Sequence, residues 1–246
     1  MDVFQGKYII QEYMRYHTLL FDVDNTLLDF DANEAESFRS LLCDQGEGYT
    51  EERYQTYQKL NRELWKSMER QEKTVDEVLN SRFALLMEKY GKQVDGTEWE
   101  KNYRKYLNRG IQEIPQVHEV LSELKKDYRL YVVTNGLQET QEYRMKASGL
   151  KGYFEKCFIS QEIGAAKPSK EFFDYVKEQI PEFAAEKTMI IGDSLTSDIL
   201  GGNRAGITTC WFRKNGSETL DVPEGEQIPD LVIDHLSDLL TVLNRE

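Results

Sequence analysis

Two aspartates one residue apart, Asp22 and Asp24, directly follow the apolar run Leu19–Phe21. Residues i and i+2 of a strand point to the same side, so both carboxylates would be aimed at one region beyond the strand's end. Two carboxylates ~5 Å apart repel each other by roughly 3 kcal/mol at an effective dielectric constant of ~20. The pair therefore predicts a cation between them, and a metal beside an exposed carboxylate predicts phosphoryl chemistry.

Three further polar clusters each come at or soon after the end of an apolar run. They are Thr134-Asn135-Gly136, Ala166-Lys167-Pro168, and Gly192-Asp193-Ser194 with Asp198 five residues further on. The carboxyl ends of parallel strands share one edge of a sheet, so all four clusters are expected to meet there. The summed repulsion of four carboxylates would rival the ~5–15 kcal/mol stability of a whole domain. Compensation is expected from Lys167 and a hard divalent cation, with Mg²⁺ preferred because it binds through a few carboxylates and retains waters and substrate phosphate.

The elements that would position these clusters are short apolar runs with β-branched residues. There are six of them: Thr18–Val23, Leu130–Thr134, Cys157–Ser160, Thr188–Ile191, Thr208–Phe212 and Leu231–Ile233. Helical patterns lie between most of these runs. Alternation of strand and helix predicts an α/β fold with a doubly wound parallel sheet.

The stretch from 32 to 110 breaks this alternation. It has four helical segments, roughly 32–44, 51–69, 74–90 and 97–109, and no strand pattern between them. Thr74 followed by Glu77 fits a capping box at the start of the third segment.

We therefore expect three parts in the chain. Residues 17–31 and 111–246 would form the α/β catalytic core, and residues 32–110 a helical cap domain inserted after the first strand. Residues 1–16 would be an N-terminal extension, to which the sequence assigns no role.

Composition excludes some classes of function. The chain has 246 residues and a net charge of −13, which argues against binding polymeric nucleic acid or an anionic membrane surface. No apolar run approaches the ~20 residues needed to cross a bilayer. The three cysteines, Cys43, Cys157 and Cys210, match no zinc spacing, and their odd number suits a reducing compartment. A cytoplasmic location is expected.

The polar clusters also carry a family resemblance. Asp-x-Asp-x-Thr at 22–26, the Thr134 turn, Lys167 and Gly-Asp-x-x-x-x-Asp at 192–198 occur in this order. Together they resemble the four signature motifs of the haloacid dehalogenase-like (HAD) phosphohydrolases, over roughly residues 18–240. The resemblance implies a Rossmann-like HAD core, with the inserted domain acting as a lid over the catalytic edge.

The resemblance also implies roles for individual residues. Asp22 would be the nucleophile that becomes an aspartyl phosphate. Asp24 would protonate the leaving oxygen and then act as general base for the hydrolytic water. Thr134 and the backbone N–H of Asn135 would bind phosphoryl oxygens, while Lys167 would offset negative charge.

Four aspartates make up the implied metal site and its support. Asp193 would ligate Mg²⁺ together with Asp22 and the backbone carbonyl of Asp24. Asp198 would support these ligands from behind, through a water or through Lys167.

Two polar residues of the predicted cap fall on apolar helix faces. Asn61 and Arg82 would either meet the substrate's leaving group or satisfy each other inside the cap, because burial without a partner is costly. Asn61-x-x-Leu64-Trp65, Arg82-Phe83 and the run Ile199–Ile207 also resemble the pyrimidine 5′-nucleotidase subgroup of the family. That subgroup hydrolyses nucleoside monophosphates.

The sequence thus predicts a Mg²⁺-dependent phosphomonoesterase, acting through an aspartyl phosphate on pyrimidine nucleoside 5′-monophosphates. Two alternatives stay open: a phosphatase or mutase of sugar phosphates or other small phosphorylated metabolites, and a non-catalytic phosphate-sensing module. The intact set Asp22, Asp24, Lys167 and Asp193 favours an enzyme. A small phosphorylated substrate is the expected partner, and the chain is expected to be a monomer or weak homodimer.

Overall fold

The computed structural model describes residues 16–214 and 224–243. Its contacts divide the chain into two compact units. We call the described residues from 16 to 29 and from Glu113 onward the core unit, and Phe30–Gln112 the cap unit. Within the described part of the chain, no helix is both long and apolar enough to cross a bilayer.

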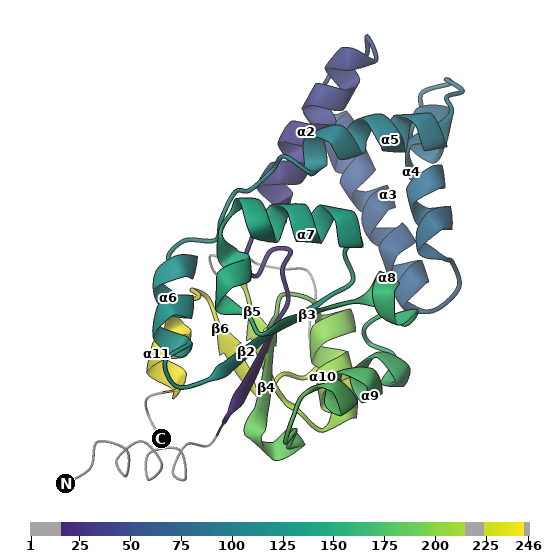
Figure 1. Cartoon of the computed structure of the whole chain (residues 1–246). Coiled ribbons are helices and arrows are strands. Elements are labelled where there is room, and N and C mark those ends of the chain that lie inside the picture. Colours follow the sequence, from purple (N-terminus) through teal and green to yellow (C-terminus); the bar gives the residue numbers. More distant parts are fainter. Residues whose placement is uncertain (1–15, 215–223, 244–246) are drawn as a thin grey trace, which may run out of the picture. The chain divides into compact units, whose positions relative to one another are not determined.

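A six-stranded parallel sheet forms the centre of the core unit, with strand order β3-β2-β1-β4-β5-β6 (Figure 1). Each predicted apolar run contributes one strand: β1 (Thr18–Phe21), β2 (Arg129–Thr134), β3 (Lys156–Ile159), β4 (Thr188–Gly192), β5 (Thr208–Phe212) and β6 (Leu231–Ile233). The predicted doubly wound α/β fold is therefore confirmed.

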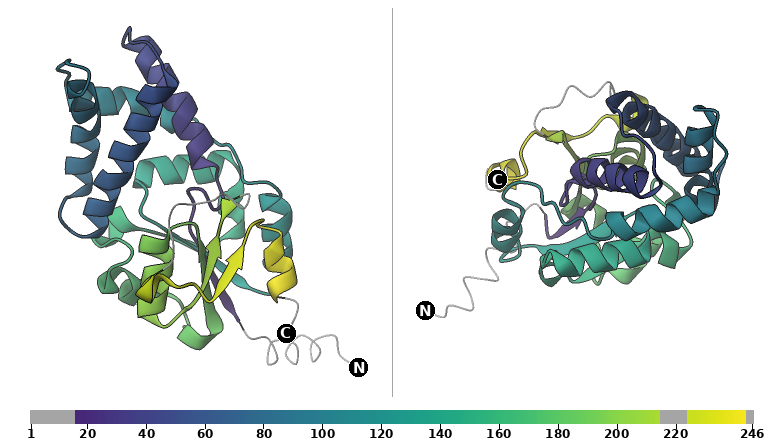
Figure 2. Two further views of the ribbon diagram at one scale, coloured as in Figure 1. Left: turned by 180° about the vertical axis from the view of Figure 1, so that it is seen from behind. Right: turned by 90° about the horizontal axis from the view of Figure 1, so that it is seen from above.

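Alternate residues of each strand face opposite layers of helices. Leu19 and Phe21 of β1 belong to the apolar cluster that also contains residues of α6, α7 and α11, whereas Leu20 packs with residues of α9 and α10. Figures 1 and 2 show the two layers from opposite sides. These helices are α6 (Val117–Leu124), α7 (Gln138–Ala147), α9 (Lys170–Gln179), α10 (Leu200–Ala205) and α11 (Asp238–Leu243). Burial on both faces explains why the strands read as continuous apolar runs.

Short helical segments connect the longer elements of the core unit. They are η1 (Leu150–Tyr153), α8 (Ser160–Ile163), η2 (Ala185–Lys187), the π-helical η3 (Leu195–Ile199) and η5 (Gly225–Gln227).

Four helices build the cap unit: α2 (Phe30–Asp44), α3 (Glu51–Glu69), α4 (Val75–Glu88) and α5 (Gly96–Leu107). The capping box predicted at Thr74 and Glu77 is present at the start of α4. An aromatic cluster fills the interior, in which Tyr57 stacks on Phe38 and Phe83 at centroid distances of 4.7 and 5.5 Å.

The register of the sheet brings the chemical motifs together. Phe21, the last residue of β1, pairs with Val132 of β2 on one side and Ile191 of β4 on the other. Asp22 extends this pairing by donating its backbone N–H to the carbonyl of Ile191 at 2.9 Å. Residues that follow β1, β2 and β4 therefore converge beside the point where the strand order reverses, the usual ligand position in such sheets.

Candidate active site

Lys167 is the buried centre of the convergent cluster. Its Nζ donates to Asp22 Oδ1 at 2.7 Å, to Asp198 Oδ1 at 2.6 Å and to the carbonyl of Val133 at 2.8 Å. These three bonds use all the donors of an ammonium group. Burial opposes the charge, but the carboxylates of Asp198 and Asp22 outweigh it, so the pKa of Lys167 is raised and the group stays protonated.

The side chain of Asn135 holds the backbone of Lys167 in place. Its Oδ1 accepts from the Lys167 N–H, and its Nδ2 donates to the Lys167 carbonyl, both at 2.9 Å. This reciprocal pair ties the loop between α8 and α9 to the end of β2. The sequence indicated only a backbone role for Asn135, because the loop that its side chain meets is distant in the chain.

Three carboxyl groups lie within reach of a single ion. Asp22, Asp193 and Asp198 each offer one oxygen, and these oxygens lie within 4.8 Å of one another. Burial raises the pKa of Asp22 to about 7; Lys167 opposes this shift, and the carboxylates of Asp198 and Asp24 add to it. Lys167 contacts two of these carboxyl groups, Asp22 and Asp198. A hard divalent cation with oxygen ligands fits the donor atoms that the three groups offer.

Asp198 is held close to the end of β4. Its Oδ2 accepts from the backbone N–H of Ser194 at 3.2 Å, while its Oδ1 contacts Lys167. A Cβ atom at Gly192 would stand only 2.2 Å from Asp198 Oδ2. The glycine of the Gly-Asp motif is therefore needed for this approach of the Asp198 side chain.

Asp24 lies beside the cluster but has its own partners on α7. Its Oδ2 accepts from Gln141 Nε2 at 2.7 Å, and its Oδ1 accepts from Arg144 Nη1 at 2.5 Å. Sequence reasoning missed both residues. The available signal was a Gln and an Arg three residues apart, which share one face of a helix that begins just after the Thr134 turn.

Thr134, the last residue of β2, is also anchored by two donors. Its Oγ1 accepts from the backbone N–H of Gly136 and from Gln141 Nε2, each at 3.0 Å. Because both lone pairs of the hydroxyl are occupied, its proton is left to act as a donor. This is the property required for binding a phosphoryl oxygen.

The two cap residues predicted as substrate contacts are bonded to each other. Arg82 Nη1 donates to Asn61 Oδ1 at 3.2 Å. Arg82 Nε also donates to Glu100 Oε2 at 2.8 Å, and Asn61 Nδ2 donates to Glu34 Oε1 at 2.9 Å. All four residues are buried, one on each cap helix.

A parallel sheet with Asp22, Lys167 and Asp193 at its edge defines a HAD-type hydrolase. The model of the haloacid dehalogenase-like hydrolase family matches residues 19–212, and the chain belongs to this family.

Three individual proteins of this family are similar to most of the chain. The HAD-hydrolase YfnB of Bacillus subtilis is 45% identical over 232 residues, which is 94% of this chain and 97% of YfnB. Pyrimidine 5′-nucleotidase PynA of Streptococcus pneumoniae is 40% identical over 206 residues, covering 83% of this chain and 87% of PynA. Pyrimidine 5′-nucleotidase YjjG of Escherichia coli is 30% identical over 212 residues, with coverage of 86% and 91%.

One solved structure agrees closely with this fold. The crystal structure of YfnB bound to magnesium superposes with a TM-score of 0.88 at 44% identity, covering 94% of this chain and 99% of that chain.

Proposed function

We propose that this hydrolase is a Mg²⁺-dependent phosphomonoesterase that acts through an aspartyl phosphate. The observation that carries the proposal is the gathering of Asp22, Asp193 and Asp198 within reach of one ion, with Lys167 bonded to two of them. Carboxylates brought together in a buried site are costly unless positive charge offsets them. Lys167 and a divalent cation together suit a phosphoryl group, whose transfer depends on positioning and charge stabilisation.

Asp22 is assigned as the nucleophile. The ion pair with Lys167 favours its charged form and fixes one of its oxygens. A carboxylate oxygen of Asp22 bonds to phosphorus while the bond from phosphorus to the leaving oxygen breaks. Asp24 gives its proton to that oxygen, then takes a proton from the water that cleaves the aspartyl phosphate.

The remaining residues hold the phosphoryl group and the metal. Asp22 and Asp193, with the backbone carbonyl of Asp24, would hold Mg²⁺; when bound, the ion supplies positive charge against the phosphoryl oxygens. Thr134 donates its hydroxyl proton and Asn135 its backbone N–H to those oxygens. Asp198 keeps Lys167 directed at Asp22 through their shared contact.

The proposed substrates are nucleoside 5′-monophosphates, with pyrimidine nucleotides preferred. The identities of 40% and 30% to PynA and YjjG, each over more than four fifths of this chain, support this choice. Substrate selection is assigned to the cap unit, the helical insertion that follows the first strand.

The test is phosphate release from pyrimidine and purine nucleoside monophosphates, sugar phosphates and an aryl phosphate, with Mg²⁺ and with a chelator. We expect release with Mg²⁺, loss of release with chelator, and the fastest turnover on pyrimidine nucleotides. Asp22→Asn should abolish turnover without unfolding the protein, whereas the matched Asp127→Asn at an exposed position should be neutral.

Two results would contradict different parts of the proposal. Substantial turnover by Asp22→Asn would remove the aspartyl-phosphate route. Faster turnover of sugar phosphates than of nucleotides would leave a phosphatase standing and remove the nucleotidase assignment.

A further inference from the structure

We propose that Gln141 and Arg144 of α7 are positioning residues that fix the carboxyl group of Asp24 for proton transfer. This inference rests on the proposed function, in which Asp24 serves as general acid and then as general base. Neither residue belongs to the four sequence motifs, yet both contact Asp24 directly.

Each oxygen of Asp24 has its own donor. Gln141 Nε2 binds Oδ2 at 2.7 Å and Arg144 Nη1 binds Oδ1 at 2.5 Å. Bonds to both oxygens fix the rotation of the carboxyl plane, and the bond from the guanidinium group is charge-assisted. A general acid depends on such orientation, because proton transfer requires hydrogen-bond geometry to the reacting oxygen.

Burial differs on the two sides of this contact. The Arg144 side chain is 1% exposed and Gln141 is 2% exposed, while the Asp24 side chain is 28% exposed. The donors are therefore held inside the core unit, and the carboxyl group that they hold remains accessible. This is the arrangement expected of a reactive group supported from behind by fixed partners.

The amide of Gln141 has a defined orientation. Its Oε1 faces Arg144 Nη1 at 3.4 Å, and its Nε2 donates to Thr134 Oγ1 at 3.0 Å as well as to Asp24. Turning the amide by half a rotation would place Oε1 against the Asp24 carboxylate, acceptor against acceptor. The network therefore couples the proposed acid to Thr134, the proposed phosphate-binding hydroxyl.

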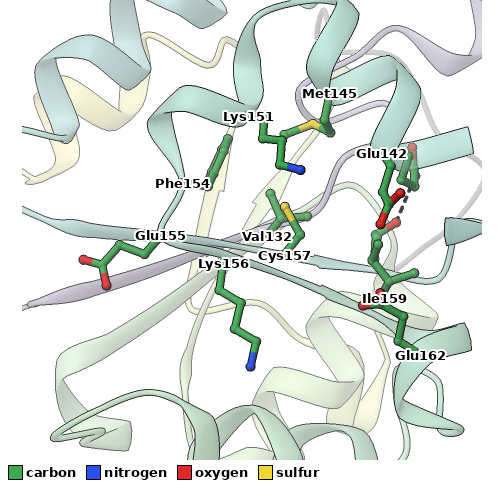
Figure 3. A pocket seen from close by; sticks show the side chains of 12 residues that line it. Val132, Glu142, Met145, Lys151, Phe154, Glu155, Lys156, Cys157, Ile159 and Glu162 are labelled. Atoms are coloured by element: carbon green, nitrogen blue, oxygen red, sulfur yellow. Dashed lines mark hydrogen bonds between the residues drawn. The ribbon is translucent and has the colours of Figure 1, made fainter. Parts of the chain in front are cut away.

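Local structure makes room for this arrangement. A Cβ atom at Gly136 would lie only 2.3 Å from Gln141 Nε2. A glycine at this position of the turn therefore leaves the space that the Gln141 amide occupies. Gln141, Thr134 and Met145 also line a cavity of about 240 Å³, whose other lining side chains include Phe154 and Cys157 (Figure 3). The cavity means that methionine can replace Gln141 without overpacking the site.

The chemical consequence depends on the leaving group. A basic alkoxide needs a proton as the bond to phosphorus breaks, whereas a nitrophenolate leaves with little help. Loss of acid orientation should therefore slow alkyl and nucleoside phosphates much more than nitrophenyl phosphate. A purely structural defect would slow all of them by the same factor.

The experiment compares kcat over a series from nitrophenyl to phenyl to alkyl phosphate for the wild type, Gln141→Met and Arg144→Met. General acid catalysis contributes about 10²–10⁴-fold, so partial loss of orientation should lower kcat on alkyl phosphate by about 10–100-fold. On the same basis we expect less than about a threefold loss on nitrophenyl phosphate. The matched control is Gln138→Met on the same helix, whose amide contacts Glu142 and Glu162 and not Asp24.

A double variant separates action through Asp24 from other effects. Gln141→Met added to Asp24→Asn should lower kcat much less than it does in the wild-type background, because the carboxyl group that it positions is already gone and only its bond to Thr134 is lost. A further drop as large as in the wild-type background would overturn the inference. If Arg144→Met does not fold, Gln141→Met carries the test alone.

The acid role of Asp24 and the positioning role of Gln141 and Arg144 can fail separately. If Asp24→Asn itself shows no dependence on the leaving group, the acid role of Asp24 in the proposed function is wrong. If Asp24→Asn shows a steep dependence and Gln141→Met slows every ester equally, only the positioning role is overturned.

Discussion

Each unit of the molecule contains a buried cation among acidic side chains, and the two networks differ in the partners of the cation and in their place in the fold. In the core unit, Lys167 contacts Asp22 and Asp198, and Asp193 adds a third carboxylate. In the cap unit, two arginines meet two glutamates: Arg82 and Arg104 both contact Glu100, and Asn61 links Arg82 to Glu34.

Their surroundings differ as well. The guanidinium carbon of Arg82 lies 4.8 Å from the ring centre of Tyr103 and 5.2 Å from that of Phe83, so aromatic faces stabilise it. Lys167 instead lies beside the backbone carbonyl of Val133, at the end of the sheet where ligands bind. The cap arginine thus has its carboxylate, amide and aromatic partners within the cap unit, whereas the core network gathers three carboxyl groups within reach of one ion at the ligand-binding end of the sheet.

The largest expected effect comes from removing the cation of the core network. Lys167→Met should lower turnover by at least about 10²–10³-fold, the typical loss when one charge-stabilising donor is removed. The metal-free protein should also lose about 3–5 kcal/mol of unfolding free energy, because Asp22 and Asp198 keep their burial without a partner. Phosphate release and urea unfolding, each with and without Mg²⁺, measure both changes.

Mg²⁺ should stabilise Lys167→Met more than it stabilises the wild type, since the variant has more uncompensated negative charge. Lys170→Met is the control, because that lysine is exposed and pairs only with Asp174 among the described contacts. Wild-type turnover in Lys167→Met would show that the core network is structural, and the contrast with the cap unit would disappear.

Removing the cation of the cap network should reduce stability by a similar amount but leave turnover nearly unchanged. Arg82→Met leaves Glu100 buried without one of its partners, and we expect a loss of about 3–5 kcal/mol in unfolding free energy. Turnover of a minimal aryl phosphate by the folded variant should change by less than about threefold, since Arg82 takes no part in the proposed chemistry. Arg62→Met, on the exposed face of α3, is the control.

Kinetics of Arg82→Met with nucleoside monophosphates test whether Arg82 binds substrate. Full stability together with a KM for nucleoside monophosphates raised at least tenfold, about 1.4 kcal/mol, would show that Arg82 binds substrate. The cap network would then be a recognition site, and the bonds among its own residues would be no guide to its role.

The sequence was sufficient to predict the gathering of Asp22, Thr134, Lys167 and Asp193. Apolar β-branched runs identify the strands, and the carboxyl ends of parallel strands share one edge of the sheet, so side chains distant in the chain meet without further information. The cap helices were predictable for a similar reason, because each has an apolar stripe at helical spacing.

Side-chain partners between elements could not be predicted in the same way. Helical spacing puts Gln141 and Arg144 on one face of α7, but it does not say that this face meets Asp24. The bond between Asn61 and Glu34 likewise depends on how α3 packs against α2. The π-helical turn that carries Asp198 has no sequence signal of its own.

The smallest expected effect is a pH dependence of stability that belongs to the cap network. Burial raises the pKa of Glu34 to about 7; Arg82 opposes the shift and Asp31 adds to it, while Asn61 donates a hydrogen bond to the carboxyl group. In the unfolded chain the carboxyl group titrates near its ordinary value of 4.5. Between these two values the folded protein binds more protons than the unfolded chain, so this contribution to stability is full below pH 4.5 and is lost as the pH rises to about 7.

Glu34→Gln removes this titration while keeping an oxygen that can accept the bond from Asn61. The variant should therefore gain stability relative to the wild type as the pH rises from 5 to 8, by up to about 3 kcal/mol. Urea unfolding of both proteins at the two pH values isolates Glu34, because all other titrating groups are common to them. Equal pH slopes would mean that Glu34 is ionised in the folded cap unit at pH 5. The cap network would then consist of charged pairs even at low pH, unlike the core network, in which burial raises the pKa of Asp22 to about 7.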